Sequence, residues 1–587
     1  MSSPAQPDAP FTAPHPGSSE MPQWTTGELP APPRLGWNLW ALVGPGIVMS
    51  ASAIGGGEWL LGPTVTARYG GAMLWLATLS IVFQALYNVE ISRYTLYCGE
   101  PIFSGKFRTL PGPLFWIGLY LLFDFSTIFP YLAANAATPI QVILLGGEIP
   151  KPDQVAAHWW LAKITSTVIF LLGMIPLVFG GKIFDSLRVV MSAKLAIVFS
   201  FLLVLAVLYS HWSTWVEIGS GFFKFGNVPV RHGEDWNGNG LLDPGEDWDG
   251  DGRLDVVEEV SADGKLIDAD GDGIRDGDNA QNVFLSLARG EWPKIDFGLV
   301  AFITAMAAIA GNGGLSNTPM SNYIRDQGWG MGQHVGAIPS FVGGRGIGLS
   351  HVGCVFEVTE QVLPRWRQWY WKVVREQLLI WMPACFVGLA LPSMMSVEFL
   401  QRGTQAGDWN GAVMTAKGVQ EHVAQPAAGT LAYESGLSNV LYGRAWGNLF
   451  WSLTLLCGFL VLATTLVSTT DGIIRRWVDA FWTSSRRLRE VHPEAIRHVY
   501  FGVLLAYVAF GMVALWLNKP AALITWATLG FNLALGFSCW HTLAINLLLL
   551  PRELRPGWFM RISLILGGLF FAALFAVTVL EKLGAFK

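Results

Sequence analysis

Two glycine-rich segments inside apolar stretches bring together residue types that could bind a cation. The first is Gly55-Gly56-Gly57-Glu58, and the second is Gly311-Asn312-Gly313-Gly314. A helix that breaks inside a membrane leaves backbone carbonyls and N–H groups without partners, which is costly unless something binds them. These carbonyls, the Glu58 carboxylate and the Asn312 amide are hard oxygen donors, and neither segment contains Cys, His or Met. Such donors suit magnesium, calcium or manganese.

An acidic side chain at membrane depth is costly, so its default interpretation is a functional site. The alternative is that Glu58 lies one turn nearer the interface and pairs with a loop residue. Magnesium holds its water tightly, and a roomy site with one carboxylate and many carbonyls could take it partly hydrated. The two segments therefore predict a metal transport site whose ligands include Gly55, Gly57, Glu58 and Asn312.

A polar stretch over residues 211–296 contains a second group of oxygen-bearing residues. Two consecutive segments fit the calcium-loop pattern D-x-[DN]-x-[DN]-G-x5-E, and a third copy has Asn279 where the bidentate Glu belongs. The predicted calcium ligands are Asp235, Asn237, Asn239, Asp243, Glu246, Asp247, Asp249, Asp251, Asp255, Glu258, Asp268, Asp270, Asp272 and Asp276.

These loops lack long amphipathic helices on both sides, so a calmodulin-like switch is not expected. Calcium would instead stabilise the insertion. Two alternatives remain open: an acidic antechamber that concentrates cations, and a merely solvated acidic loop.

The composition indicates that membrane helices position these residues. Of the 587 residues 52% are hydrophobic and only 14% are charged, whereas a soluble domain carries about a quarter charged residues. The net charge of −5 reflects acidic residues concentrated in the insertion. The five cysteines show no C-x-x-C spacing, and we expect them to be small buried hydrophobes.

Eleven apolar stretches are long enough to cross a bilayer. The two broken ones are spans one and six, so they hold the same place in two successive sets of five, as in secondary transporters with inverted repeats and a midplane site. The eleventh span follows two complete sets. The spans lie near 38–67, 71–97, 114–145, 160–180, 188–210, 297–324, 371–396, 445–470, 499–517, 520–549 and 558–582.

The positive-inside rule places the N-terminus in the cytoplasm and the insertion outside, in a bacterial-type inner membrane or a plasma membrane. The inside loops then hold most Lys and Arg residues, including a run from Arg475 to Arg497. The predicted organisation is a disordered tail (1–36), spans one to five (37–210), the extracytoplasmic insertion (211–296) and spans six to eleven (297–587).

The first two spans resemble those of the Nramp divalent-metal transporter superfamily. The matching segments are Gly44-Pro45-Gly46-Ile47-Val48, Ala67-Arg68-Tyr69-Gly70 with Leu74-Trp75, and Arg93-Tyr94 followed by Cys98-Gly99-Glu100. The resemblance implies an all-α polytopic membrane protein with a LeuT-type 5+5 inverted repeat and an eleventh transmembrane helix. It also implies metal transport across the membrane.

The chain departs from the family at its metal site. Helix one of the family carries Asp-Pro-Gly-Asn, and this chain has Gly55–Glu58 there, so the acid moves from the first place to the fourth. Helix six of the family carries Met-Pro-His, which matches Ala310, Gly311 and Asn312, and this match adds Ala310 to the predicted ligands. Loss of the soft Met ligand favours hard ions.

The family's proton pathway begins with Asp-Leu-Ala-Glu, which matches residues 101–104, and both carboxylates are absent. The chain thus resembles a divergent branch that moves magnesium, without stoichiometric proton entry.

We therefore predict a secondary transporter of divalent cations that favours magnesium, with manganese next, and binds calcium in its insertion. Its partners are the lipid bilayer and metal ions. No Ser-His-Asp or Cys-His arrangement suggests an enzyme, and nothing points to nucleic acid. One alternative is a LeuT-fold transporter of an organic solute such as an amino acid, which Glu58 disfavours by like-charge repulsion. The other is a membrane-anchored calcium-binding receptor.

Overall fold

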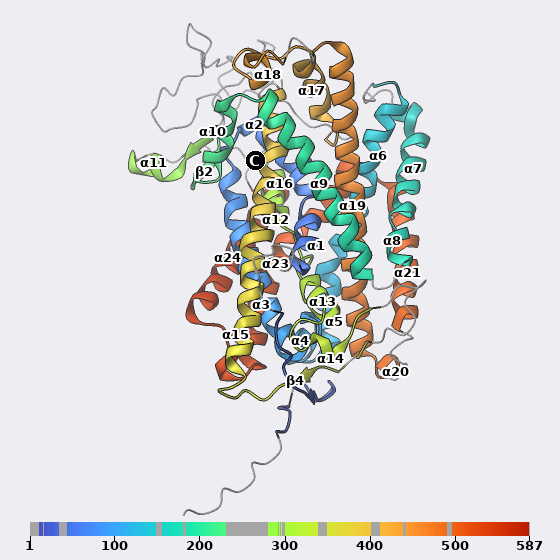
Figure 1. Ribbon diagram of the computed structural model, residues 1–587, viewed down its shortest axis with the longest axis vertical. Helices are drawn as coiled ribbons and strands as arrows, with labels where there is room; N and C mark the ends of the chain where they lie inside the picture. Colours follow the sequence, from blue (N-terminus) through green and yellow to red (C-terminus); the bar gives the residue numbers. More distant parts are fainter. Residues whose placement is uncertain are drawn as a thin grey trace, which may run out of the picture.

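The computed structural model describes residues 11–15, 17–33, 44–147, 155–179, 183–230, 280–290, 293, 295, 297, 300–338, 349–350, 352–400, 411–437, 442–489 and 496–585. Within these ranges the protein is a bundle of membrane helices (Figure 1).

Nine described helical segments are long and apolar enough to cross a membrane. They comprise α3 (Leu74–Cys98), α5 with α6 (Pro113–Asp124, Tyr131–Leu144), α7 with α8 (Val155–Leu172, Ile175–Val178), α9 (Ile183–Tyr209), α15 with α16 (Leu363–Glu376, Met382–Phe399), α19 (Arg444–Ser484), α21 (Ile496–Leu517), α23 (Phe531–Leu548) and α24 (Trp558–Lys582).

Two shorter, interrupted helices complete the eleven predicted spans. The first consists of α1 (Pro45–Ala53) and α2 (Gly62–Tyr69), and the second consists of α12 (Val300–Ile309) and α13 (Pro319–Asp326). The tenth predicted span is also divided, because α22 (Pro520–Leu529) and α23 are separated at Gly530. The prediction of an all-α polytopic membrane protein is thus confirmed.

Short elements connect the spans. The helices among them are α4 (Ile102–Phe107), α10 (Trp212–Gly221), α11 (Val283–Ala288), α14 (Gly332–Val335), α17 (Met414–Ala424), α18 (Leu431–Glu434) and α20 (Arg486–Arg489). Strand β1 (Thr25–Thr26) pairs in parallel with β4 (Cys354–Val355), and β2 (Asn227–Pro229) pairs antiparallel with β3 (Ala280–Asn282).

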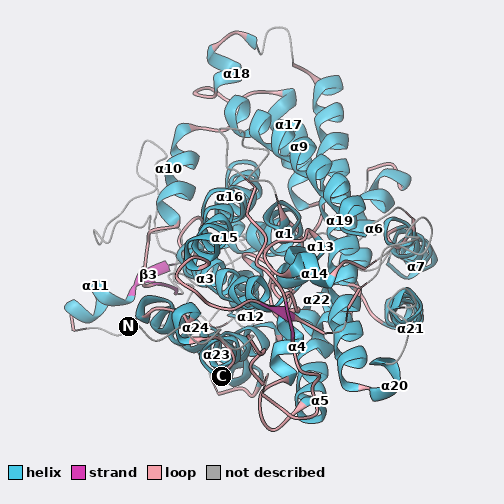
Figure 2. Cartoon of the chain, turned by 60° about the horizontal axis from the view of Figure 1, so that its bottom comes forward, coloured by secondary structure: helices cyan, strands magenta, loops and turns pink. Residues whose placement is uncertain are grey.

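The interrupted helices occupy the centre of the bundle (Figures 1 and 2). Every residue of α2 and of α13 is buried, although α13 is rich in polar side chains. Outer helices instead expose apolar side chains, such as Val204 of α9 and Leu569 of α24, which suits a surface in contact with lipid. Polar residues therefore gather inside the bundle, where neighbouring helices supply their partners.

Helix α19 extends well beyond the predicted span 445–470. Arg475 and Arg476 lie within it and are 0% and 1% exposed, so their assignment to a cytoplasmic loop was wrong. They stay helical and buried because acidic side chains pair with them, at 2.6 Å between Arg475 and Asp471 and 2.7 Å between Arg476 and Asp124.

The described part of the N-terminal segment packs against the protein, in contrast to the predicted disordered tail. Trp24 and Leu29 are buried. The Thr25 N–H donates to the Gly353 carbonyl at 2.9 Å, and the Arg365 guanidinium donates to the Leu29 carbonyl at 2.7 Å. A few apolar anchors and backbone hydrogen bonds thus order a segment whose composition alone suggested disorder. The five cysteines are free and buried, as predicted.

Candidate cation site at two helix breaks

The first break separates α1 from a π-helical turn over Gly57–Leu61 that leads into α2. Its three glycines are required by close approach of other helices. A β-carbon added at Gly55, Gly56 or Gly57 would come within 2.7 Å of a side chain from another helix. Gly55 faces Thr465 of α19, Gly56 faces Tyr131 of α6, and Gly57 faces Ile309 of α12. The break is therefore the point where three helices converge on span one.

The second break runs between α12 and α13. Gly311, Gly313 and Gly314 have φ values of 128°, 64° and 53°. Residues with a β-carbon rarely adopt this backbone conformation. The chain can therefore leave the helix here without strain. Both predicted breaks are present.

The two breaks meet at Glu58. Its Oε2 accepts a hydrogen bond from the Gly55 N–H at 2.8 Å. The second break adjoins the first here, because a β-carbon added at Gly57 would lie 3.2 Å from the Ile309 carbonyl at the end of α12. Glu58 is fully buried, and its Oε1 has no hydrogen-bond partner among the described residues. Within the described ranges no loop side chain pairs with Glu58, in contrast to the alternative prediction.

Asn312 supplies a second free oxygen. Its Nδ2 donates to Asn317 Oδ1 at 3.2 Å, whereas its own buried Oδ1 finds no partner within the described ranges. A carboxylate oxygen and an amide oxygen at adjoining breaks are thus both without donors. Leaving a buried polar atom unsatisfied costs about 1–3 kcal/mol, so each such atom calls for an explanation.

Gln84 of α3, which the sequence analysis did not single out, organises the second break. Its Nε2 donates to the Ala310 carbonyl at 3.2 Å. Its Oε1 accepts from the Asn312 N–H at 3.0 Å and from Asn317 Nδ2 at 2.8 Å. The Ala310 carbonyl, a predicted ligand, therefore already has one partner, and its second lone pair remains available.

Lys194 of α9 organises the first break. Its Nζ donates to the Ala51 carbonyl at 2.7 Å, to Thr465 Oγ1 at 2.5 Å and to the Ile54 carbonyl. Lys194 is 2% exposed. It reaches the same break as Glu58, since the Ile54 carbonyl that it binds directly precedes Gly55, whose N–H donates to Glu58. The site thus contains an ammonium as well as a carboxylate, and the prediction from sequence omitted the ammonium.

The other end of α1 holds a second buried acid. Glu376 Oε1 accepts from the Gly44 and Gly46 N–H groups, both at 2.8 Å. A β-carbon at either glycine would lie 2.7–2.8 Å from this side chain, which explains both glycines around Pro45. The helix dipole favours an anion at the N-terminus and a cation at the C-terminus. Glu376 and Lys194 satisfy both preferences.

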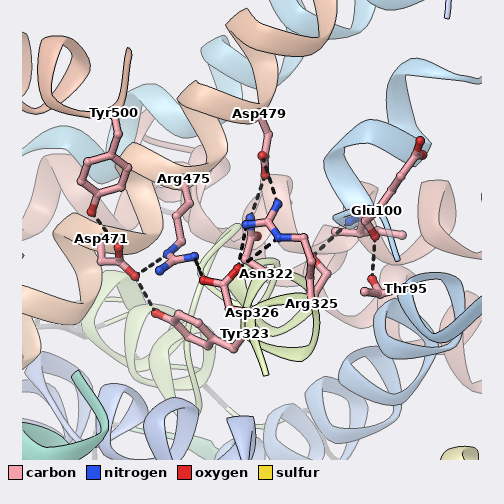
Figure 3. A network of polar contacts seen from close by, with 12 residues as sticks. Thr95, Glu100, Asn322, Tyr323, Arg325, Asp326, Asp471, Arg475, Asp479 and Tyr500 are labelled. Carbon is pink, nitrogen blue, oxygen red and sulfur yellow. Dashed lines mark hydrogen bonds and ion pairs between the residues drawn. The ribbon is translucent and has the colours of Figure 1, made fainter. Parts of the chain in front are cut away.

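A network of ion pairs links α13 to α19 (Figure 3). Asp326 of α13 pairs with Arg475 at 2.6 Å and with its neighbour Arg325 at 2.9 Å. Asp471 accepts from Arg475 at 2.6 Å and from Tyr500 at 2.7 Å. The half-helix after the second break is therefore fixed to spans eight and nine.

Two further polar side chains inside predicted spans, Asp124 and His541, have structural roles. Asp124 of α5 binds Arg476 and accepts from Trp477 Nε1 at 2.8 Å. The His541 ring contacts Thr109 Oγ1 at 2.8 Å and Tyr120 OH at 2.7 Å. These side chains are satisfied within the core.

The three calcium loops lie outside the described residues. Across the residues that are described, no three His, Cys, Asp or Glu side chains come together as a metal site. The two breaks therefore offer one carboxylate with neutral oxygens.

A single polar residue within an apolar span is the signal that could have revealed the missed groups. Gln84, Lys194 and Glu376 lie inside the predicted spans 71–97, 188–210 and 371–396. The rule that intramembrane ionisable residues mark sites applies to the two charged ones as well as to Glu58.

No protein-family model matches the sequence, and no curated protein matches it. Solved structures do resemble it. A mutant of the Eremococcus coleocola manganese transporter is 12% identical with a TM-score of 0.51, and the match covers 96% of this chain and 91% of that one. The same transporter in complex with an aromatic bis-isothiourea substituted compound gives 12% identity and a TM-score of 0.48, over 94% and 89% of the two chains. The protein shares the fold of this manganese transporter.

Proposed function

We propose that the protein is a secondary transporter of divalent cations that binds its cargo between the two breaks, with magnesium favoured over manganese. The observation that supports this most directly is the pair of buried oxygens without donors, Glu58 Oε1 and Asn312 Oδ1. A cation between the breaks would satisfy both atoms, and the second lone pair of the Ala310 carbonyl could join them.

The chemistry of the donors supports a hard ion. Carboxylate, amide and carbonyl oxygens are the ligands of magnesium, calcium and manganese, and no Cys or Met sulfur stands at either break. With a single carboxylate the site cannot replace all the waters of magnesium, so the ion would stay partly hydrated.

Charge balance also bears on affinity. Lys194 offsets the charge of Glu58, so the site is neutral before a dication enters. Binding at such a site is weaker than between two carboxylates. Weak binding favours release, which transport requires.

We further propose that metal entry is not coupled to stoichiometric proton entry. The positions that match the family's proton pathway hold Pro101, Ile102, Phe103 and Ser104, and Asn312 stands where the family has His. None of these side chains ionises near neutral pH.

Uptake into proteoliposomes tests both proposals. Magnesium, manganese and calcium are offered side by side, with a pH dye in the lumen. We expect magnesium uptake without matching acidification, and loss of uptake in Glu58→Gln. Glu421→Gln, which removes an exposed carboxylate on α17, is the matched control. Lack of uptake of every cation would contradict the transport proposal, and acidification that scales with uptake would contradict uncoupled entry.

A further inference from the structure

Exposed apolar side chains gather around the two short strands, β2 and β3, from which the insertion extends. Isolated exposed apolar residues are ordinary on a protein surface, but a group of them in one place marks a surface that binds something. The members of this group, here called the neck patch, are 42% to 71% exposed and comprise Phe223, Phe225, Phe284, Leu285 and Leu287.

Asn282 holds α11 against the loop that precedes β2. Its Nδ2 donates to the Phe225 carbonyl at 3.0 Å. Its Oδ1 accepts from the N–H groups of Phe284 and Leu285 at 3.1 Å and 3.3 Å, which caps the first turn of α11. The Phe284 ring packs on Gly226, where an added β-carbon would lie 2.5 Å from it. The side chains of the neck patch therefore belong to one fixed unit.

Two hydrogen bonds to α3 fix the depth of this unit in the membrane. Thr78 Oγ1 donates to the Phe222 carbonyl at 2.7 Å, and Trp75 Nε1 donates to the Asn227 carbonyl at 2.9 Å. Helix α3 is long and apolar enough to cross the membrane, and it begins at Leu74. At 1.5 Å per residue Thr78 lies about 6 Å from that end. The loop therefore lies beside the first turn of a membrane-crossing helix, at the level where the lipid headgroups meet the hydrocarbon.

Helix α11 needs a partner that the bundle does not supply. It has six residues, Val-Phe-Leu-Ser-Leu-Ala, and none of them is buried. It projects away from the other helices in both views (Figures 1 and 2). A helix this short is marginal in water, whereas helices with Phe and Leu on one face are stable in the membrane interface. Lys224 and Arg289 stand beside the neck patch, and long cationic side chains extend from apolar surroundings to lipid phosphates.

We propose that the neck patch is a lipid anchor, which inserts into the leaflet at the end of the bundle where α3 begins and holds the base of the insertion against the bilayer. The partner is lipid because the loop from Phe222 to Asn227 lies at the level of the lipid interface. The intervening segment 231–279 is rich in Asp and Glu, and such residues favour water over an apolar surface. This assignment rests on the contacts of the neck and not on the proposed cargo.

A spin label on the full chain tests the proposal. Phe284→Cys carries a nitroxide in vesicles of phosphatidylcholine and phosphatidylglycerol. Its collisions with oxygen, which dissolves in lipid, are compared with its collisions with a water-soluble nickel chelate. The five native cysteines are buried, so the unchanged protein gives the background labelling. Leu569→Cys on α24 is the reference for lipid, and Lys417→Cys, at a side chain 77% exposed on α17, is the reference for water. The ratio of oxygen to nickel collisions at position 284 should be several-fold above that at 417 and no higher than that at 569.

A label at Leu285→Cys should give the same result and serves if Phe284→Cys does not fold. A ratio like that at position 417 would overturn the proposal. Spin–spin broadening that disappears on mixing with unlabelled protein would overturn it in favour of a second copy of the chain. Nickel access that appears only after removal of residues 231–278 would show that the insertion itself covers the patch, and would overturn it as well. Failure of the protein to transport any divalent cation would leave these collision ratios unchanged and count against the proposed function alone.

Discussion

At the scale of single residues, Glu58 should decide whether a dication binds. Glu58→Gln keeps the size and the contact with the Gly55 N–H but removes the negative charge that faces the cargo. Transport should fall severely, because only neutral oxygens and the positive Lys194 would then face a dication. Asn312→Ala should reduce transport less, since water can replace one neutral ligand. Initial uptake rates of magnesium in proteoliposomes measure both effects.

Expression and thermal stability provide the control for this comparison. Both variants should be produced at normal levels, because Glu58→Gln keeps the contact with the Gly55 N–H and Asn312→Ala removes a single hydrogen bond, to Asn317. Normal magnesium uptake by Glu58→Gln would contradict the proposed site while leaving the fold untouched.

At the scale of elements, the ion pair between α5 and α19 should contribute strongly to stability. Asp124→Asn leaves the Arg476 guanidinium buried, and no other acidic side chain in the described ranges pairs with it. Removing one partner of a buried pair costs about 3–5 kcal/mol, because the remaining charge is uncompensated. A large drop in the melting temperature of the purified protein is therefore expected.

Asp185→Asn is the matched control for that loss. Asp185 pairs with Arg188 at 3.6 Å, and the two side chains are 54% and 43% exposed. Exposed pairs contribute about 0–1 kcal/mol, so the melting temperature should hardly change. Equal effects of the two variants would refute a structural role for the buried pair.

A second interaction between elements should make stability depend on pH. His211, at the start of α10, contacts the Glu398 carboxylate at the end of α16 at 2.6 Å and the Ala428 carbonyl at 2.9 Å. Burial favours the neutral imidazole, but the Ala428 carbonyl and the Glu398 carboxylate outweigh it and raise the pKa of His211 above its ordinary value.

The protonated His211 contributes to the free energy of unfolding. This contribution is full below the ordinary pKa of about 6.5, and it is lost as the pH rises through the raised pKa of His211 in the folded protein. The effect is modest because His211 is 37% exposed. Melting temperatures of the wild type should therefore fall from mildly acidic to mildly alkaline pH more than those of His211→Gln. Parallel curves for the two proteins would contradict this assignment.

The elements also show which features a sequence can predict. The two breaks were predictable because glycine and polar residues interrupt apolar runs, and the number of spans followed from their length. The ion-pair network around Arg475 was not predictable from the sequence. Asp326, the partner of Arg475, lies 149 positions away, and a charged residue is ordinarily assigned to a loop. Lys194 could have been noticed as a lone basic residue in an apolar span, but its acceptors come from segments far apart in the chain and only folding brings them together.

At the scale of the whole molecule, the insertion joins the membrane part through a small sheet. Pro229 of β2 pairs with Ala280 of β3, so the two ends of the intervening segment lie side by side. That arrangement makes the segment removable without pulling the spans apart. The calcium loops predicted within it can therefore be separated from the transport site by experiment.

Replacement of residues 231–278 by Asn-Gly should close β2 and β3 with a two-residue turn, since this dipeptide favours the tight turn of an antiparallel hairpin. Calcium should stabilise the full chain against heat and have no effect on the shortened one, because all the predicted loop ligands are removed. Magnesium uptake should persist, because Glu58 and Asn312 remain in place. A shortened protein that folds but no longer takes up magnesium would show that the insertion belongs to the transport pathway, as a cation-collecting antechamber. If the full chain shows no response to calcium at millimolar concentration, the loops do not bind it.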